Sequence, residues 1–199
     1  MIAELRAERH RLIVTLDALT DEDFDHGTTL CAGWSPRDVL GHVIGLDYFL
    51  ASYRTVLIGS PLSAGARINA ANGAQAERVR AMSRTRLMQW ARHWADHPTA
   101  TSKIAVPVIL GDLAMHHQDV LRGLGLKREV PDRAASAILL EGLQLSVWMN
   151  RRSLRHRIVP ADGGRPVGRR GAPEVRGTRE ALGLWLAGRD SVAPELHFG

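Results

Sequence analysis

Three side chains able to bind a cation or accept a proton share one stripe of a predicted helix. Asp112, His116 and Asp119 stand at i, i+4 and i+7 of the segment GDLAMHHQDVLRGLG, and this spacing puts all three on one helical face. Apolar residues occupy the same stripe. A carboxylate among apolar neighbours is unfavourable to bury unless a cation, a hydrogen-bond partner or a proton compensates for its lost hydration. The stripe therefore predicts a polar cluster or a bound ion inside the protein.

A histidine also interrupts the core-facing stripe of another predicted helix. His42 lies in SPRDVLGHVIGLDYFLASY, where apolar side chains otherwise recur at helical spacing. Polar side chains that point inward from two helices suggest a divalent metal site in a bundle core. The expected ligands are His42, Asp112 and His116, a set that suits zinc and is also used for iron, nickel or manganese.

The remaining carboxylate of the stripe has a different expected role. Asp119 could accept the ring N–H of His116 and orient that ligand, and Asp112 and Asp119 could also exchange these roles. The spacing alone is equally compatible with buried histidines and aspartates that only hydrogen-bond one another across the helices.

Other reactive residue types favour structural explanations. His93 and His97 form an i, i+4 pair, but they end a predicted helix, where the helix dipole favours a cationic histidine. His117 points a quarter-turn or more away from the Asp112 stripe, so we expect it at the margin rather than among the ligands. Cys31 has no base beside it in the sequence, which favours a small buried cysteine over a nucleophile. Trp34 is expected to anchor a loop.

The elements that must position these residues are predicted to be mainly helices. The first follows an amphipathic pattern over residues 2–19 and precedes an acidic connector. The second begins at Pro36 behind Ser35, within an S-x-x-D capping box, and runs to about residue 57. A Gly-, Ser- and Asn-rich stretch after it predicts a loop. Further helices are expected at 74–96, 104–124, 131–152 and 179–189.

The fold class that follows is mainly α. Four long helices with a fifth alongside predict a bundle over residues 1–152. Residues 153–199 are expected to form a small α+β segment packed on this bundle, because Asp162, Gly163 and Gly164 predict the turn of a β-hairpin and Thr178 caps a last helix.

Composition limits the functional classes. The chain has 199 residues, a formal charge of +5 and one cysteine, which excludes an internal disulfide. Its basic residues are almost all scattered arginines, so we rank nucleic-acid binding lowest; it would require strongly salt-dependent affinity. The sequence contains neither an apolar run long enough for a membrane span nor a signal peptide, and we expect a soluble cytoplasmic protein.

Two segments resemble a known family. Residues 29–42, TLCAGWSPRDVLGH, resemble the pattern T-x-C-x-G-W-x-x-R-D-x-x-x-H of the mycothiol-dependent maleylpyruvate isomerase family, itself similar to the DinB/YfiT-like helical bundles. The segment from Gly111 to Gly125 and the C-terminal EVRG and LWLAGR segments are also similar to this family. The resemblance covers nearly the whole chain.

The resemblance implies a bundle that holds a divalent metal, usually zinc, at His42, Asp112 and His116. Asp112 stands where the family usually has glutamate, and its side chain is one bond shorter. The family uses the metal to activate a low-molecular-weight thiol, mycothiol, for addition to a small electrophilic substrate, because a cation stabilises thiolate over thiol. A thiol S-transferase or isomerase, as a monomer or homodimer, is therefore expected. The alternative, motivated by Asp112, is a non-catalytic ligand-binding or stress-response module.

An arginine-rich segment adds a candidate cofactor contact. Arg155 and Arg157 could hold carboxylates of the thiol cofactor or of an acidic substrate, since guanidinium pairs well with carboxylate. A solvated helix end explains these arginines equally well.

Overall fold

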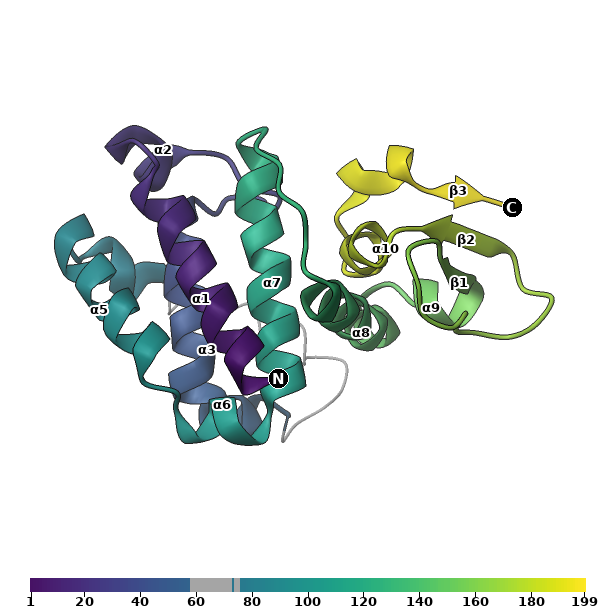
Figure 1. Ribbon diagram of the computed structural model, residues 1–199, viewed down its shortest axis with the longest axis horizontal. Coiled ribbons are helices and arrows are strands. Elements are labelled where there is room, and N and C mark those ends of the chain that lie inside the picture. Colours follow the sequence, from purple (N-terminus) through teal and green to yellow (C-terminus); the bar gives the residue numbers. More distant parts are fainter. Residues whose placement is uncertain (58–72, 74–75) are drawn as a thin grey trace. The chain divides into compact units, whose positions relative to one another are not determined.

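The computed structural model describes residues 1–57, 73 and 76–199, and most of these residues are helical (Figure 1). Most of the predicted loop after the second helix lies outside the described residues. The chain divides into two compact units, one formed by Met1–Ile109 and His116–Arg128 and the other by Leu110–Met115 and Glu129–Gly199. Helix α7, Val106–Gly123, is continuous and contributes to both units.

The first unit is a helical bundle. Its long helices run side by side in Figure 1: α1 (Ile2–Asp17), α3 (Pro36–Leu57), α5 (Arg84–Asp96) and α7. Two short helices, α2 (Asp21–His26) and α6 (Ala100–Ile104), pack against α3. Leucine, isoleucine, valine and tryptophan side chains that are almost fully buried form the core, among them Leu12, Leu16, Leu40, Ile44 and Trp94. The predicted helical bundle is confirmed.

The start of α3 follows from its capping residues. The Ser35 backbone N–H donates to Asp38 Oδ2 over 3.1 Å, and the Asp38 backbone N–H donates to Ser35 Oγ over 3.4 Å. This reciprocal pair satisfies N–H groups that the first helical turn leaves without intrahelical partners. The predicted capping box is confirmed, and it sets the turn of α3 that precedes His42.

Two local predictions are wrong. The acidic connector is the helix α2, because Thr20 caps it by accepting from the Asp23 backbone N–H over 3.0 Å and acidic residues in a first turn complement the helix dipole. The single helix predicted over 74–96 is interrupted before Arg84, where Ser83 accepts from the Arg86 backbone N–H over 3.3 Å and caps α5.

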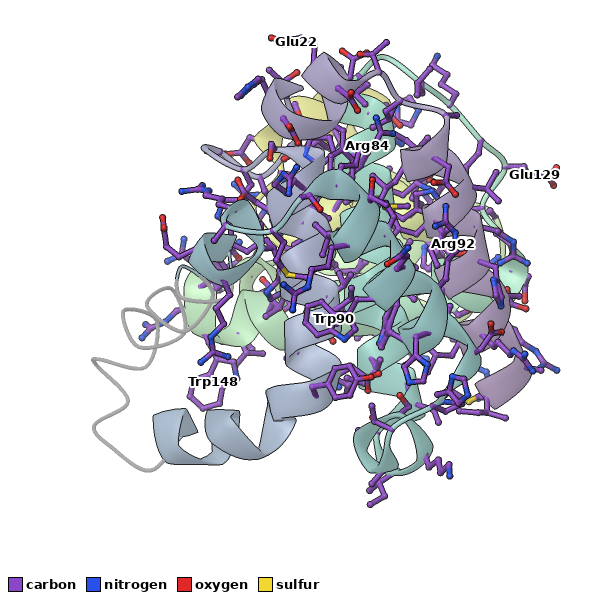
Figure 2. The ribbon with its side chains drawn as sticks, turned by 90° about the vertical axis from the view of Figure 1, so that its left-hand side faces the viewer. Glu22, Arg84, Trp90, Arg92, Glu129 and Trp148 are labelled. Carbon is purple, nitrogen blue, oxygen red and sulfur yellow. The ribbon has the colours of Figure 1, made fainter. Side chains whose placement is uncertain are left out.

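Two arginines labelled in Figure 2 tie α5 to the end of α1. Arg84 donates to the backbone oxygens of Leu16 and Leu19 over 2.8 and 2.9 Å. Arg92 donates to both carboxylate oxygens of Asp17 over 2.7 and 2.8 Å. The Leu16 and Leu19 carbonyls at the end of α1 thus receive donors from a helix far away in sequence, which holds α1 against α5.

The second unit combines helices with a small sheet. Helix α8 (Asp132–Met149) packs against α10 (Arg179–Leu186), whose side chains are nearly all buried. A short helix, α9 (Arg152–Arg155), leads into β1 (Arg157–Pro160); β2 (Glu174–Gly177) follows, and a 3-10 helix (Asp190–Glu195) precedes β3 (His197–Phe198). Thr178 caps α10 through the Ala181 backbone N–H at 3.2 Å, as predicted.

The predicted hairpin is wrong in its pairing. β1 pairs with β2 in parallel, and β3 adds to β2 antiparallel, giving the order β1-β2-β3. The chain does turn back after Gly164, but the returning segment makes only an isolated antiparallel bridge between Ile158 and Val167. It then continues to β2, so the turn residues do not join the two paired strands. None of the described helices is both long and apolar enough to cross a membrane.

Candidate metal centre

Helices α3 and α7 bring two histidines together inside the first unit. The ring centroids of His42 and His116 are 4.7 Å apart and meet edge to face. Only 4% of His42 and 7% of His116 is exposed. Burial removes both imidazoles from water, so their ring nitrogens require polar partners to compensate for the lost hydration.

Asp112 supplies a carboxylate on the same helix as His116, one turn earlier. Its spacing from His116 is fixed by the continuous helix α7. Each of His42, Asp112 and His116 offers one donor atom, and these atoms all lie within 4.8 Å of one another. The three residues selected from the sequence are therefore neighbours, and together they provide two nitrogens and an oxygen.

Asp119 lies on the next turn of α7 and contacts His116. Asp119 Oδ2 is 2.9 Å from His116 Nδ1, and the Asp119 side chain is fully buried. A carboxylate that accepts from Nδ1 fixes the orientation of the ring and directs Nε2 elsewhere. This contact is the one expected of a residue that orients a histidine ligand.

Two further residues adjoin the cluster and were not assigned to it from the sequence. The Cys31 thiol is half-buried and lies 3.1 Å from Asp119 Oδ2 and 3.6 Å from His116 Nδ1. The Trp34 ring lies 5.1 Å from the His42 ring and is stacked 5.9 Å from the His116 ring. The absence of a base near Cys31 in the sequence is thus misleading, because the fold supplies an imidazole and a carboxylate.

The loop that carries Cys31 and Trp34 is held against α7 by its backbone. The Leu30 N–H donates to the Asp119 carbonyl over 3.0 Å, and Thr28 Oγ1 donates to the Gly123 carbonyl over 2.8 Å. A Cβ at Gly123 would lie 2.3 Å from the Thr28 carbonyl oxygen, so only glycine permits this approach. The loop is therefore tied to the same helix that carries His116 and Asp119.

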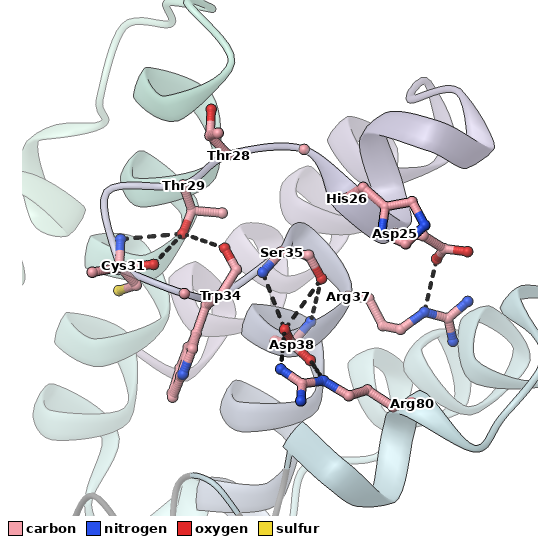
Figure 3. A pocket seen from close by; sticks show the side chains of 13 residues that line it. Asp25, His26, Thr28, Thr29, Cys31, Trp34, Ser35, Arg37, Asp38 and Arg80 are labelled. Carbon is pink, nitrogen blue, oxygen red and sulfur yellow. Dashed lines mark hydrogen bonds and ion pairs between the residues drawn. The ribbon is translucent and has the colours of Figure 1, made fainter.

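An open pocket borders this loop (Figure 3). Its volume is about 740 Å³, within the range of small-molecule sites. Cys31 and Trp34 line it, together with residues of the α2–α3 segment and Arg80. Arg80 donates to both oxygens of Asp38 over 2.9 Å. Burial acts to raise the pKa of Asp38, but the Arg80 and Ser35 hydrogen bonds outweigh it and the pKa is lowered.

The other histidines singled out from the sequence lie apart from this cluster. The rings of His93 and His97 stack with centroids 4.0 Å apart, and His97 Nδ1 is 2.8 Å from the His93 carbonyl oxygen at the end of α5. His117 Nδ1 is 2.8 Å from Glu8 Oε1, and its Nε2 is 2.8 Å from Thr15 Oγ1. His117 is thus fully engaged on another face of α7, and its burial lowers its pKa.

The two arginines predicted to bind a cofactor lie in the second unit. Arg155 is exposed at the end of α9, and Arg157 in β1 pairs with Glu174 over 2.8 Å. One of the two thus already has a carboxylate partner within its own sheet.

Imidazoles and a carboxylate that converge from two helices of a bundle have the arrangement found in bundles that hold cations between their helices. Residues 5–121 match the mycothiol maleylpyruvate isomerase N-terminal domain family. The chain belongs to this family.

Comparison with solved structures gives the same fold. A histidine-to-alanine mutant of the mycothiol-dependent maleylpyruvate isomerase matches with a TM-score of 0.59 at 12% identity, covering 100% of this chain and 91% of that one. A further structure of the mycothiol-dependent maleylpyruvate isomerase matches with a TM-score of 0.54 at 11% identity, with the same coverage. No curated protein sequence matches the chain.

Proposed function

We propose that this protein is a metal-dependent enzyme that uses a low-molecular-weight thiol of the mycothiol type, as an S-transferase or an isomerase. The observation that carries the proposal is the convergence of His42, Asp112 and His116, with donor atoms within 4.8 Å of one another. Family membership supports the choice of thiol.

The donor set fits a divalent cation. Two imidazole nitrogens and one carboxylate oxygen are ligands common to zinc and several other first-row metals, and three protein ligands leave a coordination position for an exogenous ligand. Buried histidine ligands usually donate their other N–H to a carboxylate, which is the relation between His116 and Asp119. Zinc is the favoured ion because this ligand set is typical of its catalytic sites.

Each residue then has a role of its own. His42, Asp112 and His116 would hold the cation, and Asp119 would keep the His116 ring turned toward it. The Trp34 ring lies against both imidazoles. A bound cation would supply stabilisation of a thiolate, the nucleophile for addition to an activated double bond, an epoxide or a carbon with a leaving group. Arg155 and Arg157 stay candidate contacts for carboxylates of the thiol or substrate.

Metal content measured by elemental analysis tests the proposal. Protein purified from metal-supplemented medium should carry about one divalent ion per chain at this centre, and the metal content of the His42→Ala variant should be lower by that one ion. His93→Ala is the matched control, because His93 is exposed and lies in another cluster. Wild-type protein without metal, or equal metal in the His42→Ala variant, would overturn the proposal.

A thiol assay then separates an enzyme from a binding module. Mycothiol consumption in the presence of a panel of electrophiles should depend on His42 and on the added metal. The shorter reach of Asp112, compared with the glutamate usual in the family, favours a second candidate, a module that binds the thiol without turnover. Saturable thiol binding with no consumption across the panel would select this second function.

A further inference from the structure

The side chains of Cys31, His116 and Asp119 form a second group of potential metal ligands beside the first. Their donor atoms, like those of the first group, all lie within 4.8 Å of one another. The three residues all belong to the first unit. His116 is common to both groups, and it faces Cys31 and Asp119 through Nδ1.

We propose that Cys31, His116 and Asp119 form a thiolate-containing cation position, on the Nδ1 side of the His116 ring, for a divalent ion that accepts sulfur. The proposal goes beyond the function above and shares two residues with it. His116 is a ligand in both, and Asp119, which orients the His116 ring while Nδ1 carries a proton, becomes a ligand when the ion takes the place of that proton. Cys31 would be the ligand nearest the pocket, since it is half-buried and lines that pocket.

The distances among the three donor atoms fit tetrahedral coordination. Metal bonds of about 2.3 Å to sulfur and about 2.0–2.2 Å to nitrogen or oxygen require donor atoms about 3.3–3.6 Å apart. The separations are 3.6 Å from Cys31 Sγ to His116 Nδ1, 3.1 Å from Cys31 Sγ to Asp119 Oδ2, and 2.9 Å from His116 Nδ1 to Asp119 Oδ2. Two of these are hydrogen-bond lengths that need to widen by less than about half an ångström to accommodate the ion.

Charge also favours a dication at this position. A thiolate and a carboxylate together carry two negative charges, which a divalent ion neutralises, and the imidazole adds a neutral donor. On binding, the ion replaces the thiol proton, which is released to solvent. When no ion is held at His42, the His116 ring proton moves from Nδ1 to Nε2 and the imidazole stays neutral; when both positions are filled, this proton is also released and the imidazolate bridges the two ions. The buried Asp119 carboxylate then loses its hydrogen bonds with Cys31 and His116 and gains direct contact with the positive ion.

The loop that presents Cys31 is already organised for coordination. Thr29 Oγ1 accepts from the Cys31 backbone N–H over 3.1 Å and donates to the Trp34 carbonyl over 2.9 Å. Gly33, with a positive φ of 78°, completes the tight turn between Cys31 and Trp34. A ligand whose backbone is fixed loses little further conformational entropy when it binds an ion.

A thiolate ligand selects among metals. Sulfur favours zinc, cobalt and cadmium over magnesium, calcium and manganese, which prefer oxygen. Cobalt(II) is the probe of choice, because thiolate coordination gives it an intense near-ultraviolet charge-transfer band that nitrogen and oxygen ligands do not give. Since Cys31 is the only cysteine in the chain, such a band in thiol-free buffer reports on Cys31 alone.

The experiment titrates full-length, metal-free protein with cobalt(II), after the free thiol has been quantified in unfolded samples. We expect the charge-transfer band in wild-type protein and in His42→Ala, which keeps all three ligands of the new position. Cys31→Ser and Asp119→Asn should lose the band or weaken cobalt binding at this position by at least about tenfold. Far-ultraviolet circular dichroism verifies that each variant is folded.

The outcomes separate this inference from the proposed function. Absence of the band in both wild-type protein and His42→Ala at saturating cobalt would overturn the thiolate position, whatever the metal content. An unchanged band in Asp119→Asn would also overturn it, because a thiolate that binds without Asp119 uses other partners. Loss of about one metal equivalent in His42→Ala, with the band retained, would support both proposals; retention of all the metal together with the band would support only the thiolate position.

Discussion

Two clusters of buried and half-buried polar side chains lie among the same helices, and the loss of hydration of their charged groups is compensated in different ways. The Arg9 cluster joins α1, α3, α5 and α6 and consists of Arg9, Asp47, Trp94, Thr99 and Ser102. The His42 cluster joins α3, α7 and the loop before α3 and consists of His42, Asp112, His116, Asp119 and Cys31. A buried guanidinium faces the carboxylate in the first, whereas imidazoles, carboxylates and a thiol converge in the second.

The charges of the Arg9 cluster neutralise each other, although Arg9 Nε has no hydrogen-bond partner among the described residues. The Arg9 guanidinium donates to Asp47 and Ser102, and neither Arg9 nor Asp47 has an exposed side chain. The remaining lone pairs of Asp47 accept from Trp94 Nε1 over 2.8 Å, Ser102 Oγ over 2.6 Å and Thr99 Oγ1 over 2.7 Å. A buried ion pair surrounded by hydrogen bonds of this kind holds helices in a fixed arrangement.

The His42 cluster contains residue types that all serve as metal ligands. Such residues bind a dication when they are held at coordination distance, and the donor atoms of each candidate group lie within 4.8 Å of one another. Burial of charge alone therefore does not indicate a functional site. What distinguishes the two clusters is whether the converging groups neutralise each other or can jointly neutralise an added ion.

The largest effect is expected from breaking the ion pair of the Arg9 cluster. Asp47→Ala leaves the fully buried Arg9 guanidinium without its carboxylate, and removal of one partner from a buried pair costs about 3–5 kcal/mol. Urea denaturation measures the loss in the free energy of unfolding. Asp17→Ala is the matched control, because it breaks the half-exposed Arg92–Asp17 pair and should cost at most about 1 kcal/mol. Equal losses in the two variants would refute the structural role of the Arg9 cluster.

A second buried carboxylate links stability to pH. Burial acts to raise the pKa of Glu8, but hydrogen bonds from His117 and Arg128 hold it at about 2, below its ordinary value of 4.5. A carboxyl whose pKa is lower in the folded protein contributes stability above pH 4.5, and this contribution disappears as the pH falls toward 2. The difference corresponds to about 3 kcal/mol.

Glu8→Gln should therefore lower the free energy of unfolding by about 3 kcal/mol at pH 7 and flatten its decline in acid. Denaturation curves at a series of pH values between 7 and 2 measure both effects. The exposed Glu22→Gln variant serves as the control and should follow wild-type protein throughout. An undiminished acid decline in Glu8→Gln would show that other groups dominate acid unfolding.

The His42 cluster should instead respond in metal affinity. Asp119→Asn keeps the shape of the side chain but weakens its interaction with the His116 ring, and loss of such an orienting carboxylate lowers metal affinity about tenfold to a hundredfold. Chelator competition with zinc measures the change. The comparison is best made in a Cys31→Ser background, where His42, Asp112 and His116 remain as the candidate ligand set among the residues that the structure describes. An unchanged affinity would remove the orienting role of Asp119.

The parts of the fold that depend on local sequence could be predicted. Ser35 and Thr178 predict where the helices they cap begin, because their side chains accept hydrogen bonds from backbone N–H groups three residues later. Helix α2 could not be predicted, because it has only 6 residues and its acidic sequence is also typical of a polar connector. The parallel pairing of β1 and β2 could not be predicted from the Gly163–Gly164 turn, since strand order is decided by tertiary packing.

The residues of the candidate site also fall into two groups, those whose relation follows from local sequence and those that only the tertiary fold brings together. The spacing of Asp112, His116 and Asp119 follows from one helix and needs no knowledge of the fold. The approach of His42 to His116 depends on how α3 packs near α7, which the inward stripes suggest but do not fix. Cys31 joins the cluster through a loop held by the Leu30 N–H on the Asp119 carbonyl, a contact between residues far apart in sequence that has no signature in either segment.

The smallest effect, and the sharpest contrast with Asp47→Ala, is expected for His42→Leu in the presence of a chelator. The substitution removes ring contacts with Trp34 and His116, worth about 0.5–1.5 kcal/mol, but it adds apolar burial beside a core that already contains Val39 and Val43. We therefore expect the free energy of unfolding to change by less than about 1 kcal/mol, because groups arranged for a ligand contribute little to stability without it. Adding zinc should then raise the free energy of unfolding of wild-type protein more than that of the variant. An ion that binds only the folded state stabilises it by about 2.7 kcal/mol at a concentration a hundred times its dissociation constant. A loss in the metal-free variant as large as that of Asp47→Ala would mean that both clusters are structural and that the distinction between them is wrong.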